Sequence, residues 1–158
     1  MTVGLVDPDF FQVATYGDWI IGAECESGKI VIREFKNPTH LIHKLGPQYK
    51  KAFMNDCNSY LPVCTFNRVF IIMENYLFYT SLEDSLLIVD LDDGFKVRET
   101  FVELVCHFSI YRNIMCLVSA DRTISKFKIR ENAELLLIKA SVVEKSKRYS
   151  FHTICRLV

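Results

Sequence analysis

The sequence predicts an all-β domain made of antiparallel four-stranded meanders, and three observations support this fold class. Short apolar runs with period-two alternation recur along the chain and are joined by tight polar turns. Strand-forming aromatic residues are abundant, with 12 Phe and 7 Tyr, while Gly (6) and Pro (4) are scarce. Similar stretches recur at a period of about 40–45 residues, which is typical of repeated β units.

Residues 105–129 show the predicted unit most clearly. Alternating residues at 105–110 and an apolar run at 114–118 predict two strands with a short polar turn between them. Ser119 and Asp121 then provide turn chemistry, because their side chains can bond nearby backbone groups. The stretch lacks apolar residues three and four apart over a longer window, so it does not predict a helix.

The same stretch resembles a known family. Residues 119–127, SADRTISKF, resemble the turn and third strand of a WD-repeat propeller blade, and residues 108–120, FSIYRNIMCLVSA, resemble its first two strands. Phe127 stands where the family usually has Trp, and Lys128 stands where its Asp would follow. No Gly-His pair opens the unit, so the resemblance is to a degenerate blade. It implies a scaffold that presents rigid blades to proteins without a cofactor.

Two further units can be laid over this one within a single predicted domain, residues 1–158. The first spans residues 11–45, with a hairpin turn at Ser27 and Gly28 and an outer strand at its end. The second spans residues 61–101. Residues 46–60 carry turn formers and Lys pairs without alternation, so we expect an inserted loop there. The outer strand of the third unit is expected at residues 133–140, and the chain ends on a remnant of a fourth unit.

The number of units has a consequence for function. A propeller closes with at least about four blades, so three units and a remnant predict an incomplete ring. Unpaired edges and uncovered apolar faces favour association with another chain. We therefore expect protein partners that complete or cover the open sheet edges within a larger assembly. A β-sandwich of two meandering sheets is the alternative fold, and it needs no partner.

Charge and cysteine content narrow the functional class. The 19 basic and 19 acidic side chains cancel, so no long-range field steers the chain toward nucleic acid or an anionic membrane. Six Cys without a signal-peptide pattern favour reduced thiols in the cytoplasm or nucleus. The longest apolar runs are far shorter than the roughly 20 residues that span a bilayer, so no membrane role is expected.

No motif in the sequence indicates catalysis, a cofactor, a metal site or a small-molecule substrate. The six Cys form no C-x-x-C pair, and His40 and His43 would point to opposite faces of a strand. Cys57, near Lys50 and Lys51, is the one thiol in a setting that could make it reactive. A cysteine-dependent enzyme is therefore a minor alternative, and we predict a protein without enzyme activity.

Aromatic and basic clusters give two sets of candidate binding residues. Aromatic side chains concentrate at interface hot spots, so the candidates for a protein interface are Phe10, Phe11, Tyr49 and Phe53. Lysines beside aromatic residues suit phosphate contact with base stacking, so an alternative role is an RNA-contacting ribonucleoprotein component. Its candidate residues are Lys50, Lys51, Lys145, Lys147 and Arg148.

Overall fold

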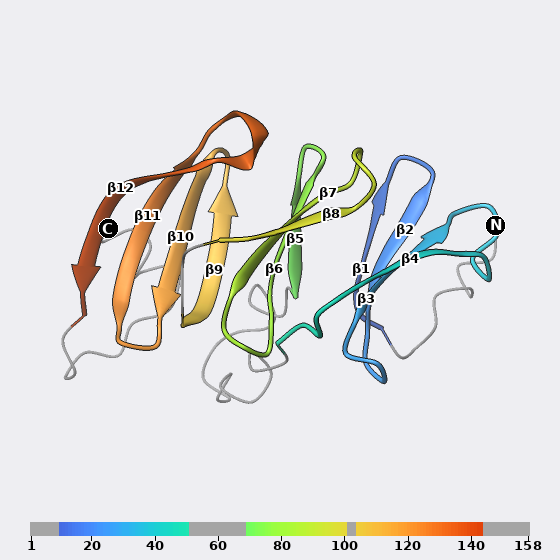
Figure 1. Cartoon of the computed structure of the whole chain (residues 1–158), viewed down its shortest axis with the longest axis horizontal. Helices are drawn as coiled ribbons and strands as arrows, with labels where there is room; N and C mark the ends of the chain where they lie inside the picture. Colours follow the sequence, from blue (N-terminus) through green and yellow to red (C-terminus); the bar gives the residue numbers. More distant parts are fainter. Residues whose placement is uncertain (1–9, 51–68, 101–103, 144–158) are drawn as a thin grey trace.

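Three four-stranded antiparallel sheets make up the described part of the chain, residues 10–50, 69–100 and 104–143 of the computed structural model (Figure 1). The first sheet contains β1 (Phe10–Tyr16), β2 (Trp19–Glu24), β3 (Ile30–Glu34) and β4 (Leu41–Leu45). The second contains β5 (Phe70–Met73), β6 (Tyr76–Thr80), β7 (Leu86–Asp90) and β8 (Lys96–Glu99). The third contains β9 (Val105–Tyr111), β10 (Ile114–Ser119), β11 (Thr123–Ile129) and β12 (Leu135–Val142), with a short 3-10 turn, η3 (Glu131–Ala133), before β12. Neighbouring strands follow chain order, so the predicted meanders are confirmed.

Tight turns close the hairpins, and they contain a glycine with positive φ and an Asp side chain that bonds the backbone. Gly28 adopts a φ of +66° and donates its N–H to the carbonyl of Glu24 at 3.0 Å. In the turn before β11, the carboxylate of Asp121 accepts the backbone N–H of Thr123 at 2.9 Å. This hydrogen bond from Thr123 lowers the pKa of Asp121 from its ordinary value.

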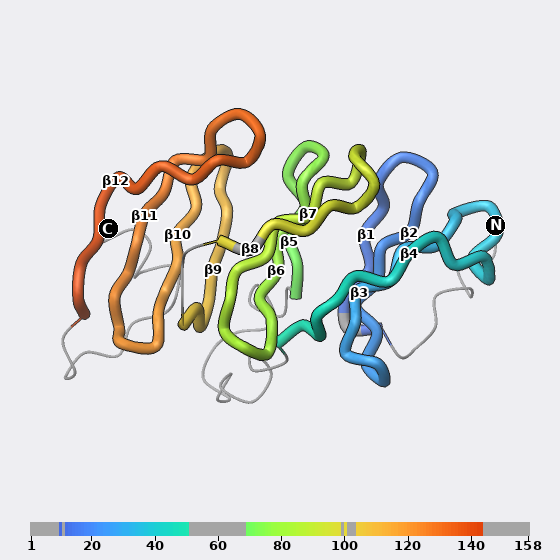
Figure 2. Tube along the Cα trace, viewed as in Figure 1, coloured from blue at the N-terminus to red at the C-terminus, as the bar shows by residue number. Residues whose placement is uncertain are grey.

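The sheets pack face to face in chain order, so the chain passes from one sheet to the next without returning (Figure 2). Strand β7 of the central sheet packs side chains on both faces. Leu87 and Val89 belong to the core shared with the first sheet, whereas Leu86 and Ile88 belong to the core shared with the third. Alternation along a strand sends successive side chains to opposite faces, so continuous apolar sequence fits a strand covered twice.

The first and third sheets each have one face turned away from this stack. The described strands therefore form an open row of three blades, as predicted, and the alternative of a two-sheet sandwich is wrong. Each of the two apolar cores lies between a different pair of sheets, whereas a sandwich buries a single core between two sheets.

Residues 46–50 follow the first sheet and form hydrogen bonds to both the first and the second sheet. The backbone N–H of Tyr49 donates to the carbonyl of Gly28 at 2.8 Å, and Tyr49 also forms a β-bridge with Ser81 of the second sheet. The hydroxyl of Tyr79 donates to the carbonyl of Gly46 at 2.8 Å. The start of the predicted inserted loop is thus part of the packing between blades, and its residues 51–60 lie outside the described part of the chain.

Candidate protein-interaction surface

The predicted aromatic interface residues have different surroundings. Phe10 is half-buried on β1, and its ring lies over Gly22, 3.2 Å from where a Cβ would stand. Phe11 is on the same strand, whereas Phe53 lies outside the described residues. The ring of Phe10 therefore packs against the backbone of its own sheet at Gly22.

Tyr49 belongs to the core between the first two sheets. Its side chain is 1% exposed, and its hydroxyl donates to the carbonyl of Glu24 at 2.8 Å. Burial raises the pKa of Tyr49 to about 12. A ring so completely covered offers no surface to another molecule.

The predicted basic clusters are only partly described. Lys50 forms an ion pair with Asp84, and its backbone N–H donates to the carbonyl of Thr80 at 2.8 Å. Both contacts attach residue 50 to the second sheet. The remaining candidates for RNA contact, which are Lys51, Lys145, Lys147 and Arg148, lie outside the described part of the chain.

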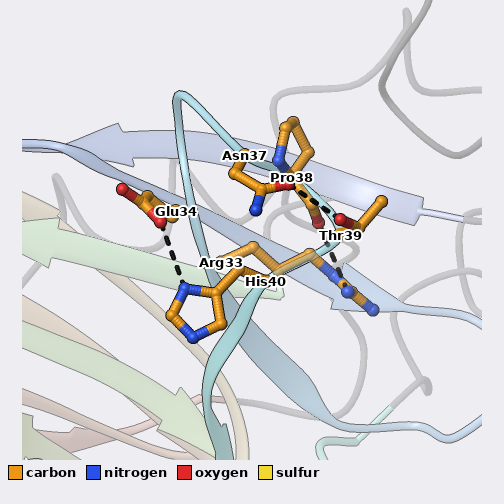
Figure 3. A network of polar contacts seen from close by, with 6 residues as sticks. All are labelled: Arg33, Glu34, Asn37, Pro38, Thr39 and His40. Atoms are coloured by element: carbon orange, nitrogen blue, oxygen red, sulfur yellow. Dashed lines mark hydrogen bonds and ion pairs between the residues drawn. The ribbon is translucent and has the colours of Figure 1, made fainter.

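His40 and His43 make separate contacts. His40 lies in the turn after β3, where its Nδ1 is 3.1 Å from a carboxylate oxygen of Glu34 (Figure 3). His43 instead stacks on Phe95, with ring centroids 4.7 Å apart. The described residues contain no cluster of three or more His, Cys, Asp or Glu side chains that could hold a metal ion. Cys57 lies outside them.

An exposed apolar strand stands out at the outer margin of the third sheet. Strand β12 is eight residues long and pairs with β11 alone among the described strands. We call this strand and its unpaired margin the β12 edge. Its exposed apolar side chains, with the exposed fraction of each, are Leu136 (48%), Leu137 (54%), Ile138 (52%) and Val142 (74%). Long apolar edges are ready templates for pairing with another strand.

The outer strands of the other two sheets lack this character. Strand β8 has four residues, KVRE, and strand β4 has five, LIHKL. Short length and charge are the usual ways in which an edge strand avoids unwanted pairing. The β12 edge therefore differs from β4 and β8, which share its position as the last strand of a sheet.

Register separates the side chains of β12 into two faces. Leu135 and Leu137 pair with Ile129 and Phe127, both of which pack into the core shared with the second sheet. The register shifts at Ile138, which has no partner on β11, so Lys139 then lies on the opposite face.

Lysines gather on that outer face of the third sheet. Lys126 and Lys139 are direct cross-strand partners, and Lys128 is two residues along β11 from Lys126. Side chains directly opposite on an antiparallel pair share a face at about 5 Å, where like charges repel. None of the three forms an ion pair with a carboxylate of the described residues. An acidic group brought to this face would therefore be attracted.

The start of β12 is held by the neighbouring sheet. Arg98 of β8 donates to the carbonyls of Asn132 and Ala133, at 3.1 and 2.7 Å, and Ala133 is buried. The backbone N–H of Arg130 donates to the carbonyl of Glu134 at 2.8 Å. These contacts fix η3, so the β12 edge begins at a rigid point of the fold.

Comparison with known proteins identifies the fold. No family model matches the sequence, and no curated protein matches it significantly. Similar solved structures are β-propellers. The N-terminal domain of Nup159 aligns with a TM-score of 0.64 at 14% identity, over 87% of this chain and 32% of that one. BamB from Moraxella catarrhalis aligns with a TM-score of 0.55 at 7% identity, over 84% of this chain and 34% of that one. Hsv2 from Kluyveromyces lactis aligns with a TM-score of 0.57 at 9% identity, over 85% and 38%.

These comparisons confirm propeller-like blades and do not support a WD repeat at the level of sequence. The chain spans about a third of the length of the propellers that it matches. Nup159 is also seen in a structure of S. cerevisiae Dbp5 bound to Nup159 and Gle1, with IP6 and ADP. In the described residues, no helix has the length and apolar character needed to cross a membrane.

Sequence reasoning placed an outer strand at residues 133–140 but missed its exposure. The run Leu135–Leu136–Leu137–Ile138 reads equally well as a buried strand, because continuous apolar sequence does not show which face is covered. The lysine row was also missed, since Lys126 and Lys139 are adjacent only through strand register. A signal was present in Lys139 itself, because a charge inside an apolar run argues against complete burial.

Proposed function

We propose that this chain is a non-catalytic interaction scaffold, a set of propeller-like blades that a partner protein stabilises within a larger assembly. The observation that carries the proposal is the unequal covering of the three sheets. In the described residues, the central sheet has a core on each side, while the first and third sheets each contribute to one of the two cores. Blades in a closed propeller have neighbours on both faces, so the two end blades offer surfaces that a partner can cover.

The solved propellers support a protein-binding role, and they do not identify the partner. Propellers of this type serve as protein-binding scaffolds, and Nup159 is seen bound to other proteins. At these identities the likeness carries the fold alone, so no partner is transferred to this chain. The neutral net charge fits a module that meets its partner through packed surface better than one steered by a strong field.

Purification of the tagged full chain from its native cells, followed by light scattering, tests this function. The scaffold account predicts a complex larger than the 18.4 kDa chain that ribonuclease treatment leaves intact. A complex dispersed by ribonuclease would instead favour the ribonucleoprotein role. A stable monomer of 18.4 kDa under native conditions, with no associated protein, would contradict the proposal.

A substitution on the open face of the first sheet makes the test specific. Val13 is 38% exposed on β1 and its neighbour Ala14 packs into the core, so Val13 lies on the face of the sheet turned away from that core. Val13→Asp is expected to weaken a complex that covers this face. Leu82→Asp makes the same apolar-to-acidic change at a residue that is 56% exposed in a turn of the second sheet, and it serves as the matched control.

A further inference from the structure

We propose that the β12 edge accepts an extended segment of a partner protein in which acidic and apolar residues alternate. The segment pairs with β12 as a fifth strand of the third sheet. This inference rests on the scaffold function above and names the surface and the chemistry of one partner. Its first support is the edge itself, eight residues long with its outer margin unpaired by any described strand.

The two faces of β12 define what the partner must carry. Leu137 and Val142 lie on the face turned toward the second sheet, and both are more than half exposed. Apolar side chains of an added strand would lie beside them and bury that surface. On the opposite face, an acidic side chain would meet Lys139, with Lys126 directly behind it. One strand with period-two alternation satisfies both requirements.

The lysine row argues against a second copy of this chain as the occupant. Two copies paired antiparallel along β12 would be related by a two-fold axis perpendicular to the sheet, which keeps the outer faces on the same side. The lysines of both copies would then gather on one face, where Lys126 and Lys139 already repel each other. An acidic partner relieves that repulsion, and a second copy increases it.

The surroundings also favour protein over RNA. Strand β12, LLLIKASV, contains no aromatic residue on which a base could stack. An unpaired strand margin instead presents N–H and C=O groups at the spacing of another strand. Glu131 and Glu134 lie at the η3 end of β12. They would repel acidic residues there, so the acidic positions of the partner should fall toward Lys139.

Peptide titration of the isotope-labelled full chain, followed by NMR, tests the proposal. The probes are a short synthetic peptide that alternates glutamate with valine, the same peptide with lysine for glutamate, and a single-stranded oligouridylate. The glutamate peptide should bind and shift amide signals along residues 135–142. The lysine peptide should bind at least about fivefold more weakly, a ratio that corresponds to one cross-strand charge pair.

Four variants locate the contact. Lys139→Glu should weaken binding of the glutamate peptide by roughly fivefold and reverse the preference between the peptides. Leu137→Thr should weaken both peptides by removing apolar surface, while the high strand propensity of threonine preserves the strand. Ile138→Pro removes one backbone N–H at the bulge, where proline is tolerated, and should weaken both peptides. Lys36→Glu makes the same charge change in an exposed turn and should leave binding unchanged.

Several outcomes would contradict the proposal, and each points to a different occupant of the β12 edge or to none. Equal binding of both peptides, or amide shifts away from β12, would overturn the proposal. Oligouridylate binding that Lys139→Glu abolishes would assign the surface to RNA instead. Dimerisation through β12, shown by sedimentation and blocked by Lys139→Glu, would assign it to a second copy. If the native complex survives Lys139→Glu and Leu137→Thr together, the β12 proposal fails while the scaffold function stands.

Discussion

Phe95 stacks on His43 across the boundary between two blades, with ring centroids 4.7 Å apart and ring planes 10° from parallel. Phe95 stands in the turn before β8 with a φ of +57°, and its ring also lies 5.2 Å from that of Trp19. A turn of the second sheet thus inserts an aromatic ring into the first. This aromatic contact is a second link between the first two sheets, in addition to the hydrogen bonds made by residues 46–50.

Replacing Phe95 by Ala should lower the free energy of unfolding by about 1.5–3 kcal/mol, less than for a fully buried Phe because this ring is half-buried. Alanine would keep the same left-handed backbone, so the loss reports the ring. Phe35→Ala is the matched control, because Phe35 is 42% exposed in a turn, and a change within about 0.5 kcal/mol is expected. Urea unfolding measures both variants, and equal losses would show that Phe95 does not join the blades.

The ion pair of Lys50 with Asp84 should contribute to the attachment of residue 50 to the second sheet. The two side chains are 17% and 31% exposed, so solvent screens the pair only partly. A double-mutant cycle with Lys50→Met and Asp84→Asn is expected to give a coupling free energy of roughly 0.5–1.5 kcal/mol. The coupling should fall in high salt. A coupling near zero at low salt would mean that backbone hydrogen bonds alone hold this segment.

Replacing Arg122 by glycine should stabilise the fold, whereas glycine destabilises it at most exposed positions. It adopts a φ of +68° in the turn between β10 and β11, a conformation that costs a side chain about 1 kcal/mol. Arg122→Gly is therefore expected to raise the free energy of unfolding by about 0.5–1 kcal/mol. Arg130→Gly is the control, since Arg130 has a φ of −96° and glycine there should destabilise. Thermal unfolding of the two variants should shift in opposite directions, and a parallel shift would refute the backbone explanation.

The free energy of unfolding should fall in alkali because two tyrosines, Tyr16 and Tyr49, ionise less readily in the folded chain. Burial raises the pKa of Tyr49 to about 12. Desolvation, together with the hydrogen bond that the Tyr16 hydroxyl donates to the carboxylate of Asp92 at 2.7 Å, raises the pKa of Tyr16 to about 12. The folded chain holds these protons more tightly than the unfolded chain, whose tyrosines titrate near 10. The stabilisation is complete below pH 10 and is lost as pH rises toward 12. Tyr49→Phe should flatten this decline in urea-unfolding curves, and an unchanged pH profile would argue that Tyr49 ionises freely.

Much of the fold could be predicted from local sequence, because strand period and turn chemistry are local properties. The alternation in residues 105–110 and the turn acid Asp121 each correspond to an element of the third sheet. Phe95 alternates with Val97 like a strand residue, yet it lies in the turn before β8, where its ring packs against Trp19 of the first sheet. A residue whose position depends on a neighbouring blade cannot be placed by a period-two signal alone.

The candidate site was harder to predict for a related reason. Tyr49 followed Gly and Pro and looked like an exposed loop aromatic, yet a bridge to Ser81 and a bond to Glu24 bury it. The exposed apolar strand at β12 looked like any buried strand. Exposure is decided by which sheet stacks on which face, and that order depends on contacts between residues far apart in the chain.

Amide hydrogen exchange of the isolated full chain tests the central claim most directly, because protection reports how well each sheet is covered. The account predicts the slowest exchange in β6 and β7, whose side chains enter both cores, and faster exchange in β1 and β12. It also predicts that β12 gains protection in the complex purified from native cells. Exchange in β1 and β12 as slow as in β7, in a monomer that binds nothing, would contradict the account.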